Sequence, residues 1–217
     1  MVTEIFNVMK ICIIVAMDSE YELVNAQLAG VGIGGHQITL HKSGVGKVNA
    51  ASRITEAILT EKPEMVISTG VAGSMDKSVH TGEFVVGQTI KYHDVWCGGD
   101  GVVGDVQGLD KPYLAPADLV AKAEALGARS GLIVSGDWFV DTAQKAAEIK
   151  QAFPEALAVD MESGALSQVC TLKGVPFLSL RLISDSDEIA REESYCNFWA
   201  TAGEESFRLL KSFLESI

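Results

Sequence analysis

Cysteine is scarce in this chain of 217 residues, and its four copies form no CxxC pair. They stand at positions 12, 97, 170 and 196, which excludes a small fold built around disulfides. Cys12 and Cys170 fall within apolar, periodic segments, which indicates buried and reduced thiols. We therefore expect a cytoplasmic protein.

Basic residues are also in short supply, with 17 Lys and Arg against 29 Asp and Glu and a formal net charge of -12. A surface this acidic repels polyphosphate chains and anionic lipid headgroups. We therefore expect neither a nucleic-acid partner nor a membrane partner. A neutral or zwitterionic small molecule is the substrate that such a surface favours.

The first hydrophobic run covers only residues 11–17, much less than a membrane span, and Glu4 rather than a basic cluster precedes it. Its continuous, largely β-branched residues indicate a strand buried on both faces. Met9 and Lys10 directly precede this run, so Met9 could be an alternative translation start. In that case residues 1–8 would be an extension with no chemical role.

The rest of the composition, 47% hydrophobic and 21% charged, fits one globular domain over residues 1–217 with a sizeable core. Periodicity predicts strands at 11–16, 36–40, 65–68, 84–90, 131–135, 156–159 and 177–184. It predicts helices at 20–28, 47–60, 116–126, 142–153, 162–172 and 192–216, with 36–40 in an antiparallel piece and 96–115 as a long loop. This alternation predicts a three-layer α/β/α sandwich around a central mixed sheet.

Carboxylates recur where the predicted strands end. Glu20, Glu162 and Asp185 each follow a strand, and ligands of such folds bind beyond the carboxyl ends of the strands. One such residue alone is best explained as a helix cap. Three that face the same rim suit acid–base hydrolysis, which needs carboxyl groups on opposite sides of a bond.

Several familiar motifs are present only in part. The glycines of 30–35 match GxGxxG, but they follow a helix and precede a strand, the reverse of a dinucleotide site. Residues 43–47 open a helix whose N–H groups suit an anion or a sugar, but they lack the Walker spacing. His93 and Cys97 share helical spacing without further metal ligands, and GxSxG is missing. We therefore expect no cofactor, no metal and no serine nucleophile.

Seven segments carry a family pattern, namely 10–20, 43–47, 69–73, 92–94, 131–139, 159–162 and 181–185. In this order and spacing they resemble the bacterial 5'-methylthioadenosine/S-adenosylhomocysteine nucleosidases of the nucleoside phosphorylase superfamily, over about residues 10–190. The resemblance implies a nucleoside phosphorylase-like fold and a homodimer, to which the apolar helix at 47–58 would contribute. It implies hydrolysis of the N-glycosidic bond of 5'-substituted adenine nucleosides.

The resemblance also implies roles for individual residues. Glu20 would activate water as the general base, Asp185 would protonate purine N7 as the general acid, and Glu162 would hold the ribose hydroxyls. Eight further residues are implied in the nucleoside site, with the two methionines at the ribose and 5' side, Phe139 stacked on the base, and Arg181 orienting carboxylates and water. They are Met17, Val45, Val71, Phe139, Val140, Met161, Arg181 and Ser184, and main-chain groups near Ser135 would reach the purine edge.

The chemistry gives these carboxyl groups opposite requirements. Breaking the C–N bond builds positive charge on the ribose, which an ionised Glu20 near the anomeric carbon and Glu162 near the hydroxyls would stabilise. Asp185 must instead carry a proton near neutral pH, so we expect its pKa to be raised by about 2 to 3. Residues 17–20 contain no arginine, and an anionic Glu20 repels phosphate, so hydrolysis is favoured over phosphorolysis.

Three alternatives stay open at this point. They are a phosphate-dependent purine nucleoside phosphorylase, a futalosine-type nucleosidase, and a nucleoside-binding module without turnover. Val71 stands where these nucleosidases often have a hydroxyl-bearing residue, and Asp160 stands where a glutamate is common. The 96–115 loop has few aromatic residues for a 5' pocket, so the 5' substituent is also open.

Overall fold

The computed structural model describes residues 8–29, 33–109, 113–185, 191–203 and 207–217. The predictions for residues 1–7 and for the first half of the glycine-rich 30–35 stretch lie outside the described residues. Residues 33–35 of that stretch form a short 3-10 turn, η1 (Ile33–Gly35).

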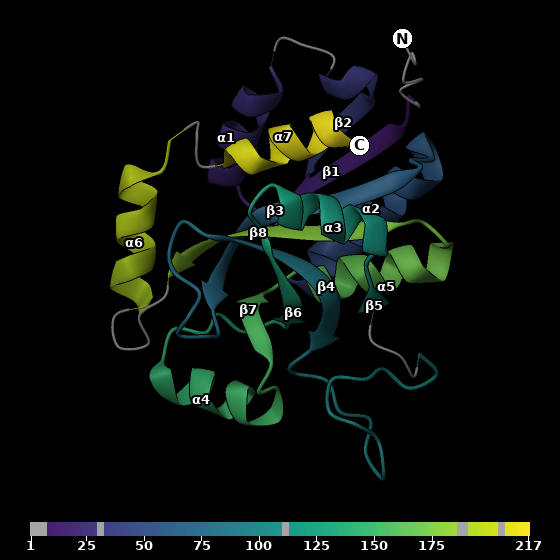
Figure 1. The fold of residues 1–217 in the computed structure, drawn as a ribbon. Helices are drawn as coiled ribbons and strands as arrows, with labels where there is room; N and C mark the ends of the chain where they lie inside the picture. The colour runs from purple at the N-terminus through teal and green to yellow at the C-terminus, as the bar shows by residue number, and fades with distance from the viewer. Residues whose placement is uncertain (1–7, 30–32, 110–112, 186–190, 204–206) are drawn as a thin grey trace.

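Within these described ranges, eight strands form one mixed sheet (Figure 1). Four neighbouring strands run parallel in the order β2-β1-β3-β8, and β4, β6 and β7 form a second parallel set that runs antiparallel to β8. The short β5 pairs antiparallel with β4. The strands are β1 (Lys10–Val15), β2 (Gln37–Lys42), β3 (Met65–Ser74), β4 (Phe84–Tyr92), β5 (Tyr113–Leu114), β6 (Arg129–Ser135), β7 (Ala156–Asp160) and β8 (Phe177–Asp185).

Helices cover both faces of this sheet, which confirms the predicted three-layer α/β/α sandwich with its mixed sheet. One core contains residues of α1, α3 and α7, and a second contains residues of α2 and α5. A third, smaller core lies under α4. The helices are α1 (Asp18–Leu28), α2 (Lys47–Glu61), α3 (Ala117–Ala125), α4 (Ala143–Ala152), α5 (Ser163–Lys173), α6 (Arg191–Thr201) and α7 (Arg208–Ser216). In the described part of the chain, none of them has the length and apolarity needed to cross a membrane.

The two parallel sets meet again at the far end of β3. Its last two residues, Gly73 and Ser74, pair antiparallel with Val159 and Ala158 of β7. Because the overlap is confined to the strand ends, the carboxyl ends of β3 and β7 come together although the strands run in opposite directions. This junction brings residues from both sets to one site.

Three local predictions were wrong. β2 runs parallel to β1 rather than in an antiparallel piece, because α1 lies between the two strands and β2 begins beside the start of β1, where Gln37 pairs with Lys10. Residues 69–73, predicted to follow a strand, continue β3 itself. The single helix predicted at 192–216 is two helices, α6 and α7, since the first ends at Thr201, two residues before Gly203, where helix propensity is low.

The fold also shows where the cysteines, His93 and the predicted long loop lie. Cys12 and Cys170 are fully buried in the core beneath α2 and α5, as predicted. His93 and Cys97 lie in an irregular segment after β4, so they do not share a helix face as their spacing suggested. Between Trp96 and Ala115, the residues that the structure describes (96–109 and 113–115) are largely irregular, as predicted, apart from β5 and one isolated bridge between Val106 and Leu109.

Candidate active site

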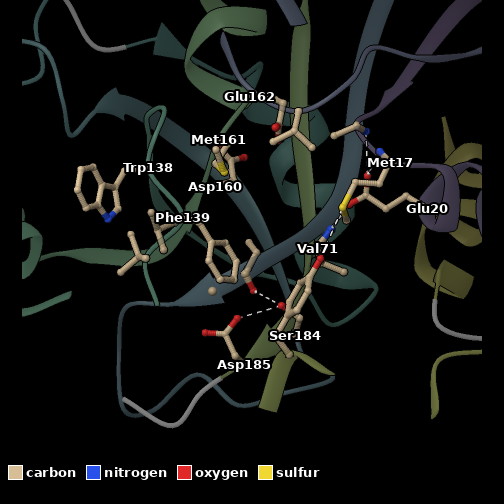
Figure 2. Close-up of a pocket in the computed structure, with 17 residues that line it drawn as sticks. Met17, Glu20, Val71, Trp138, Phe139, Asp160, Met161, Glu162, Ser184 and Asp185 are labelled. Atoms are coloured by element: carbon tan, nitrogen blue, oxygen red, sulfur yellow. Dashed lines mark hydrogen bonds between the residues drawn. The ribbon is translucent and has the colours of Figure 1, made fainter. Parts of the chain in front are cut away.

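A cavity of about 420 Å³ opens beside the junction of β3 and β7, and its size suits a small-molecule ligand. Strand ends supply most of its wall, and α1, α6 and the loops before α2 and α4 supply the rest. The lining residues are Ala16, Met17, Glu20, Val45, Val71, Ala72, Gly73, Trp138, Phe139, Val140, Val159, Asp160, Met161, Glu162, Ser184, Asp185 and Tyr195. Figure 2 shows Glu20, Glu162 and Asp185 on different sides of this space.

The structure brings together ten of the eleven site residues that the sequence predicted. Their strand ends lie far apart in the chain, and the sheet carries them to one rim. Arg181 is the exception, because it is 1% exposed and does not line the cavity. Ser135 likewise lies beneath the wall, fully buried, and is not among the lining residues.

Glu20 is held by backbone N–H groups from two strand ends. Oε2 accepts hydrogen bonds from the N–H groups of Ala16 (2.8 Å) and Met17 (3.0 Å), and Oε1 accepts one from Val71 (2.9 Å). The bond from Met17 caps α1, so the helix-cap explanation is correct for this residue, which also faces the cavity. Burial raises the pKa of Glu20, although Arg181 and the three N–H groups oppose the rise. A buried carboxylate with a raised pKa is suited to accept a proton.

Glu162 stands at the N-cap of α5 but does not cap that helix. Its Oε1 instead accepts a hydrogen bond from the N–H of Gly46, 2.9 Å away and 116 residues distant in sequence. Burial and the neighbouring Asp160 raise the pKa of Glu162 to about 8, against the opposing effect of Arg181. The carboxyl group is therefore mostly protonated near neutral pH.

A buried ion pair supports the two glutamates from behind the cavity wall. Arg181 Nε donates to Oδ2 of Asp160 at 2.7 Å, and Nη2 donates to Ser68 Oγ (2.8 Å) and Ser163 Oγ (3.0 Å). Asp160 also accepts hydrogen bonds from the N–H and hydroxyl of Ser163, which caps the start of α5. Arg181 does not line the cavity, and its predicted role of orienting carboxylates and water stays a prediction. Its guanidinium acts on Glu20 and Glu162 through charge, as the direction of their mutual pKa effects indicates.

Asp185 ends β8 and is 4% exposed. Ser184 Oγ donates to Asp185 Oδ1 at 3.0 Å, with the carbonyl of Ala72 as an alternative acceptor at 3.3 Å. Figure 2 shows Asp185 across the cavity from Glu162, and Phe139 lies at a height between these two residues. The predicted rise in the pKa of Asp185 stays a prediction.

The apolar part of the wall includes two aromatic residues that the sequence did not single out. Tyr195 of α6 packs edge-on against Phe139, with ring centroids 5.5 Å apart, and its hydroxyl donates to Met17 Sδ at 3.5 Å. Trp138 stands beside Phe139 and is 55% exposed. Trp138 was next to a predicted site residue, but no local signal in the sequence pointed to Tyr195, which only the placement of α6 brings to the cavity.

A possible metal site lies outside the cavity. Among the described residues, ligand atoms of Cys12, His41 and Glu61 lie within 4.8 Å of one another. His41 Nε2 is already 2.7 Å from Glu61 Oε1, and Glu61 Oε2 accepts a hydrogen bond from Thr39 at 2.7 Å. Since these groups are paired with each other and burial raises the pKa of Cys12 to about 12, we assign no metal to them.

The N–H groups at the start of α2 were predicted to suit an anion or a sugar. In the structure they meet carboxylates of the chain itself, with Gly46 N–H on Glu162 and Lys47 N–H on Asp137 Oδ1 at 2.7 Å. Of the described residues that line the cavity, none carries a positive charge. The cavity wall is therefore acidic and apolar.

Comparisons with known proteins agree with this geometry. The sequence model of the phosphorylase superfamily matches residues 10–215 of this chain. A 5'-methylthioadenosine/S-adenosylhomocysteine nucleosidase from Staphylococcus aureus is 34% identical over 188 residues, which cover 83% of this chain and 82% of the relative.

Solved structures resemble the fold over nearly its full length. The S-adenosylhomocysteine nucleosidase of Streptococcus pyogenes, solved with a methylthiotubercidin-type ligand, has a TM-score of 0.88 and 31% identity, covering 98% of this chain and 99% of that one. The futalosine hydrolase of Helicobacter pylori has a TM-score of 0.86 and 28% identity, and the match covers 97% of this chain and 99% of that one. This chain therefore belongs to the phosphorylase superfamily and, within it, to the family of 5'-methylthioadenosine/S-adenosylhomocysteine nucleosidases.

Proposed function

We propose that this protein hydrolyses the N-glycosidic bond of 5'-substituted adenine nucleosides, methylthioadenosine and S-adenosylhomocysteine among them. The products are adenine and the 5'-substituted ribose. The observation that carries the proposal is the meeting of Glu20, Glu162 and Asp185 on one cavity of nucleoside size. Family membership supports the same reaction.

In the proposed mechanism, Glu20 takes a proton from the attacking water. Its three N–H donors fix the carboxylate in one orientation, and burial raises its pKa toward the range where a general base works best. As the C–N bond lengthens, positive charge grows on the ribose. The carboxylate of Glu20 stabilises that charge in an environment shielded from water, while Glu162 acts through hydrogen bonds rather than through charge.

Asp185 serves the leaving group in this proposal. It donates a proton to N7 of the purine as electron density moves into the base, and the proton on Asp185 is replaced from solvent after adenine leaves. The hydroxyl of Ser184, bonded to Oδ1, holds the carboxyl group toward the base. Phe139 stacks on the base, while Met17 and Met161 border the ribose and the 5' side. The carboxyl group of Glu162 bonds the ribose hydroxyls.

Hydrolysis is favoured over phosphorolysis by the charge of the wall. Phosphate needs cations or free N–H donors, and the described lining residues carry no cation. The N–H groups at the start of α2 are occupied by carboxylates. The test is to measure base release from each candidate nucleoside with and without phosphate. Release that requires phosphate and yields ribose 1-phosphate would overturn the proposal.

A futalosine-type nucleoside is the second candidate substrate, because the structural likeness extends to a futalosine hydrolase. The same set of assays decides between the two, with methylthioadenosine, S-adenosylhomocysteine, 5'-deoxyadenosine, inosine and aminofutalosine compared by kcat/KM. Tight binding of adenine nucleosides without release of any base would favour the binding-module alternative.

We further propose that the chain acts as a single-domain subunit of a homodimer in the cytoplasm. Apolar side chains that are exposed on α2 and on the loop after β4, such as Val48 (79%) and Trp96 (64%), support a partner surface there. The exposed free thiols of Cys97 and Cys196 suit a reducing compartment. Light scattering during size-exclusion chromatography measures the subunit number, and a monomer would refute the dimer.

A further inference from the structure

Three charged residues that do not line the cavity meet just outside it. Lys47 is the first residue of α2, Asp94 follows β4, and Asp137 follows β6. Lys47 Nζ is 2.7 Å from Asp94 Oδ2 and 4.0 Å from Asp137 Oδ2, and the N–H of Asp137 donates to Asp94 Oδ2 at 2.8 Å. We call these residues the Lys47 cluster.

The cluster joins two neighbouring segments of the cavity wall. Val45 lines the cavity, and Gly46, directly after it, donates its N–H to Glu162. Residues 138–140, directly after Asp137, also line the cavity and include Phe139, which the proposed function places against the base. Any movement of Asp137 relative to Lys47 therefore changes the spacing between the two segments.

Asp137 also completes the start of α2. The N-cap of this helix is Gly46, which has no side chain to bond the first N–H groups, and Asp137 Oδ1 accepts the N–H of Lys47 in its place. The fit is close, since a Cβ on Gly46, at φ +93°, would lie 2.9 Å from Asp137 Oδ1. The carboxylate thus fixes the Gly46–Lys47 peptide, which directly follows the peptide whose N–H points at Glu162.

The charges of the cluster are well matched to this role. The side chains of Lys47 and Asp94 are 25% and 26% exposed, so their attraction is only partly screened by solvent. Burial opposes ionisation of Asp94, but the hydrogen bonds from Lys47 and from the N–H of Asp137 lower its pKa overall. The Lys47 ammonium also lies 5.3 Å from the centroid of the Tyr92 ring.

We propose that the Lys47 cluster positions the Gly46–Glu162 side of the cavity against the loop that carries Phe139, and so sets the fit of the nucleoside. Lys47, Asp94 and Asp137 are positioning residues in this proposal, not catalytic ones. The proposal rests on the proposed function, because it concerns how the same site holds its substrate.

The test compares Lys47→Met and Asp137→Ala with the wild-type chain, using methylthioadenosine as substrate. Both variants should raise KM roughly tenfold while kcat changes by less than about threefold, because substrate fit is lost and the reacting groups remain. Asp137→Asn, which keeps an oxygen acceptor for the N–H of Lys47, should recover much of the loss. Unchanged KM in both first variants would overturn the proposal.

A pH profile separates positioning from a merely structural role. Glu162 faces Asp160, Arg181 and Glu20 as well as the N–H of Gly46, and only the last contact depends on the cluster. Displacing the Gly46 N–H from Glu162 raises the pKa of that carboxyl group, so the limb of the KM profile that reports Glu162 should move to higher pH in Asp137→Ala. A variant that loses thermal stability but keeps the wild-type limb would contradict the proposal.

Asp105→Asn is the matched control. Asp105 pairs with Lys91 at 3.1 Å, with side chains 21% and 22% exposed, and neither residue lines the cavity. This variant should leave KM and the pH profile unchanged, and an effect as large as that of the cluster variants would refute the argument.

Adenine binding measured by calorimetry provides a readout that does not need turnover. If the wild-type chain releases no base from any nucleoside, the proposed function fails, while weaker adenine binding in Lys47→Met would still support the cluster. If adenine binds equally to wild type and variant, the cluster proposal fails by itself. A wild-type chain that does not bind adenine would overturn both.

Discussion

Replacing Gly70 with alanine would place a methyl group 2.4 Å from Oε1 of Glu20 and 2.8 Å from Nη1 of Arg181. Carbon atoms do not approach oxygen or nitrogen so closely without something moving. The Glu20 carboxylate is held by three backbone N–H groups, and the guanidinium is held by Asp160 and two serine hydroxyls. Gly70 also has φ of +149°, which an alanine adopts only with strain.

The expected cost follows from these contacts. Overpacking at a buried site destabilises a fold by about 1 to 3 kcal/mol. A general base contributes roughly 10²- to 10⁴-fold to the rate, and a shift of about 1 Å in a reacting group costs on the order of 10²-fold. We therefore expect Gly70→Ala to fold with reduced stability and to lose roughly 100-fold in kcat.

The assay is steady-state release of adenine, with Gly82→Ala as the control. Gly82 has φ of +88°, but a Cβ there meets no atom within 4 Å, so this variant carries backbone strain without the clash. It should be less stable and fully active. If Gly70→Ala has the same kcat as Gly82→Ala, the conclusion that Gly70 makes room for Glu20 is refuted.

A double variant checks that the effect runs through the glutamate. Glu20→Gln removes the base, so adding Gly70→Ala to it should cost little further activity, because both changes remove the same function. Additive losses would show that alanine at position 70 acts on another part of the site.

Asp185→Asn should keep nucleoside binding but lose roughly 10²- to 10⁴-fold in kcat, since an amide is no acid, and a single-turnover assay with near-wild-type rates would contradict the role. Glu162 has a folded-state pKa of about 8 against an ordinary 4.5, so its contribution to stability is lost as pH rises between these values. Glu162→Gln should flatten the decline of unfolding free energy across that window, and an unchanged slope in urea titrations would count against the shift. Arg181→Met leaves Asp160 buried without its partner and should destabilise the fold by about 3 to 5 kcal/mol, measured by chemical denaturation. A loss below about 1 kcal/mol would show that the ion pair matters little.

The elements that the sequence predicted best are those with strong local signals. The β-branched run of β1 and the apolar spacing of α2 predict their structures from neighbours along the chain alone. The direction of β2 was missed, because the choice of a strand partner depends on residues that are distant in the chain. The boundary between α6 and α7 was missed although Gly203 is a local signal for it.

The sequence by itself determined which chemical groups were available. Carboxylates at or soon after the ends of β1, β7 and β8 are a local property of the chain, and so are the strand ends themselves. Their order in the chain also carried the family resemblance. Acid–base chemistry on a small neutral ligand could therefore be predicted before any coordinates were known.

Only the tertiary structure decided how these groups are arranged. The short antiparallel overlap of β3 and β7 sets where the strand ends converge, and burial, which no single segment encodes, raises the pKa of Glu20 and of Glu162. The same packing moved Arg181 behind the wall and brought Tyr195 into it. Local sequence specifies residue type and secondary structure, whereas distances between segments and the exclusion of water arise only when the layers pack together.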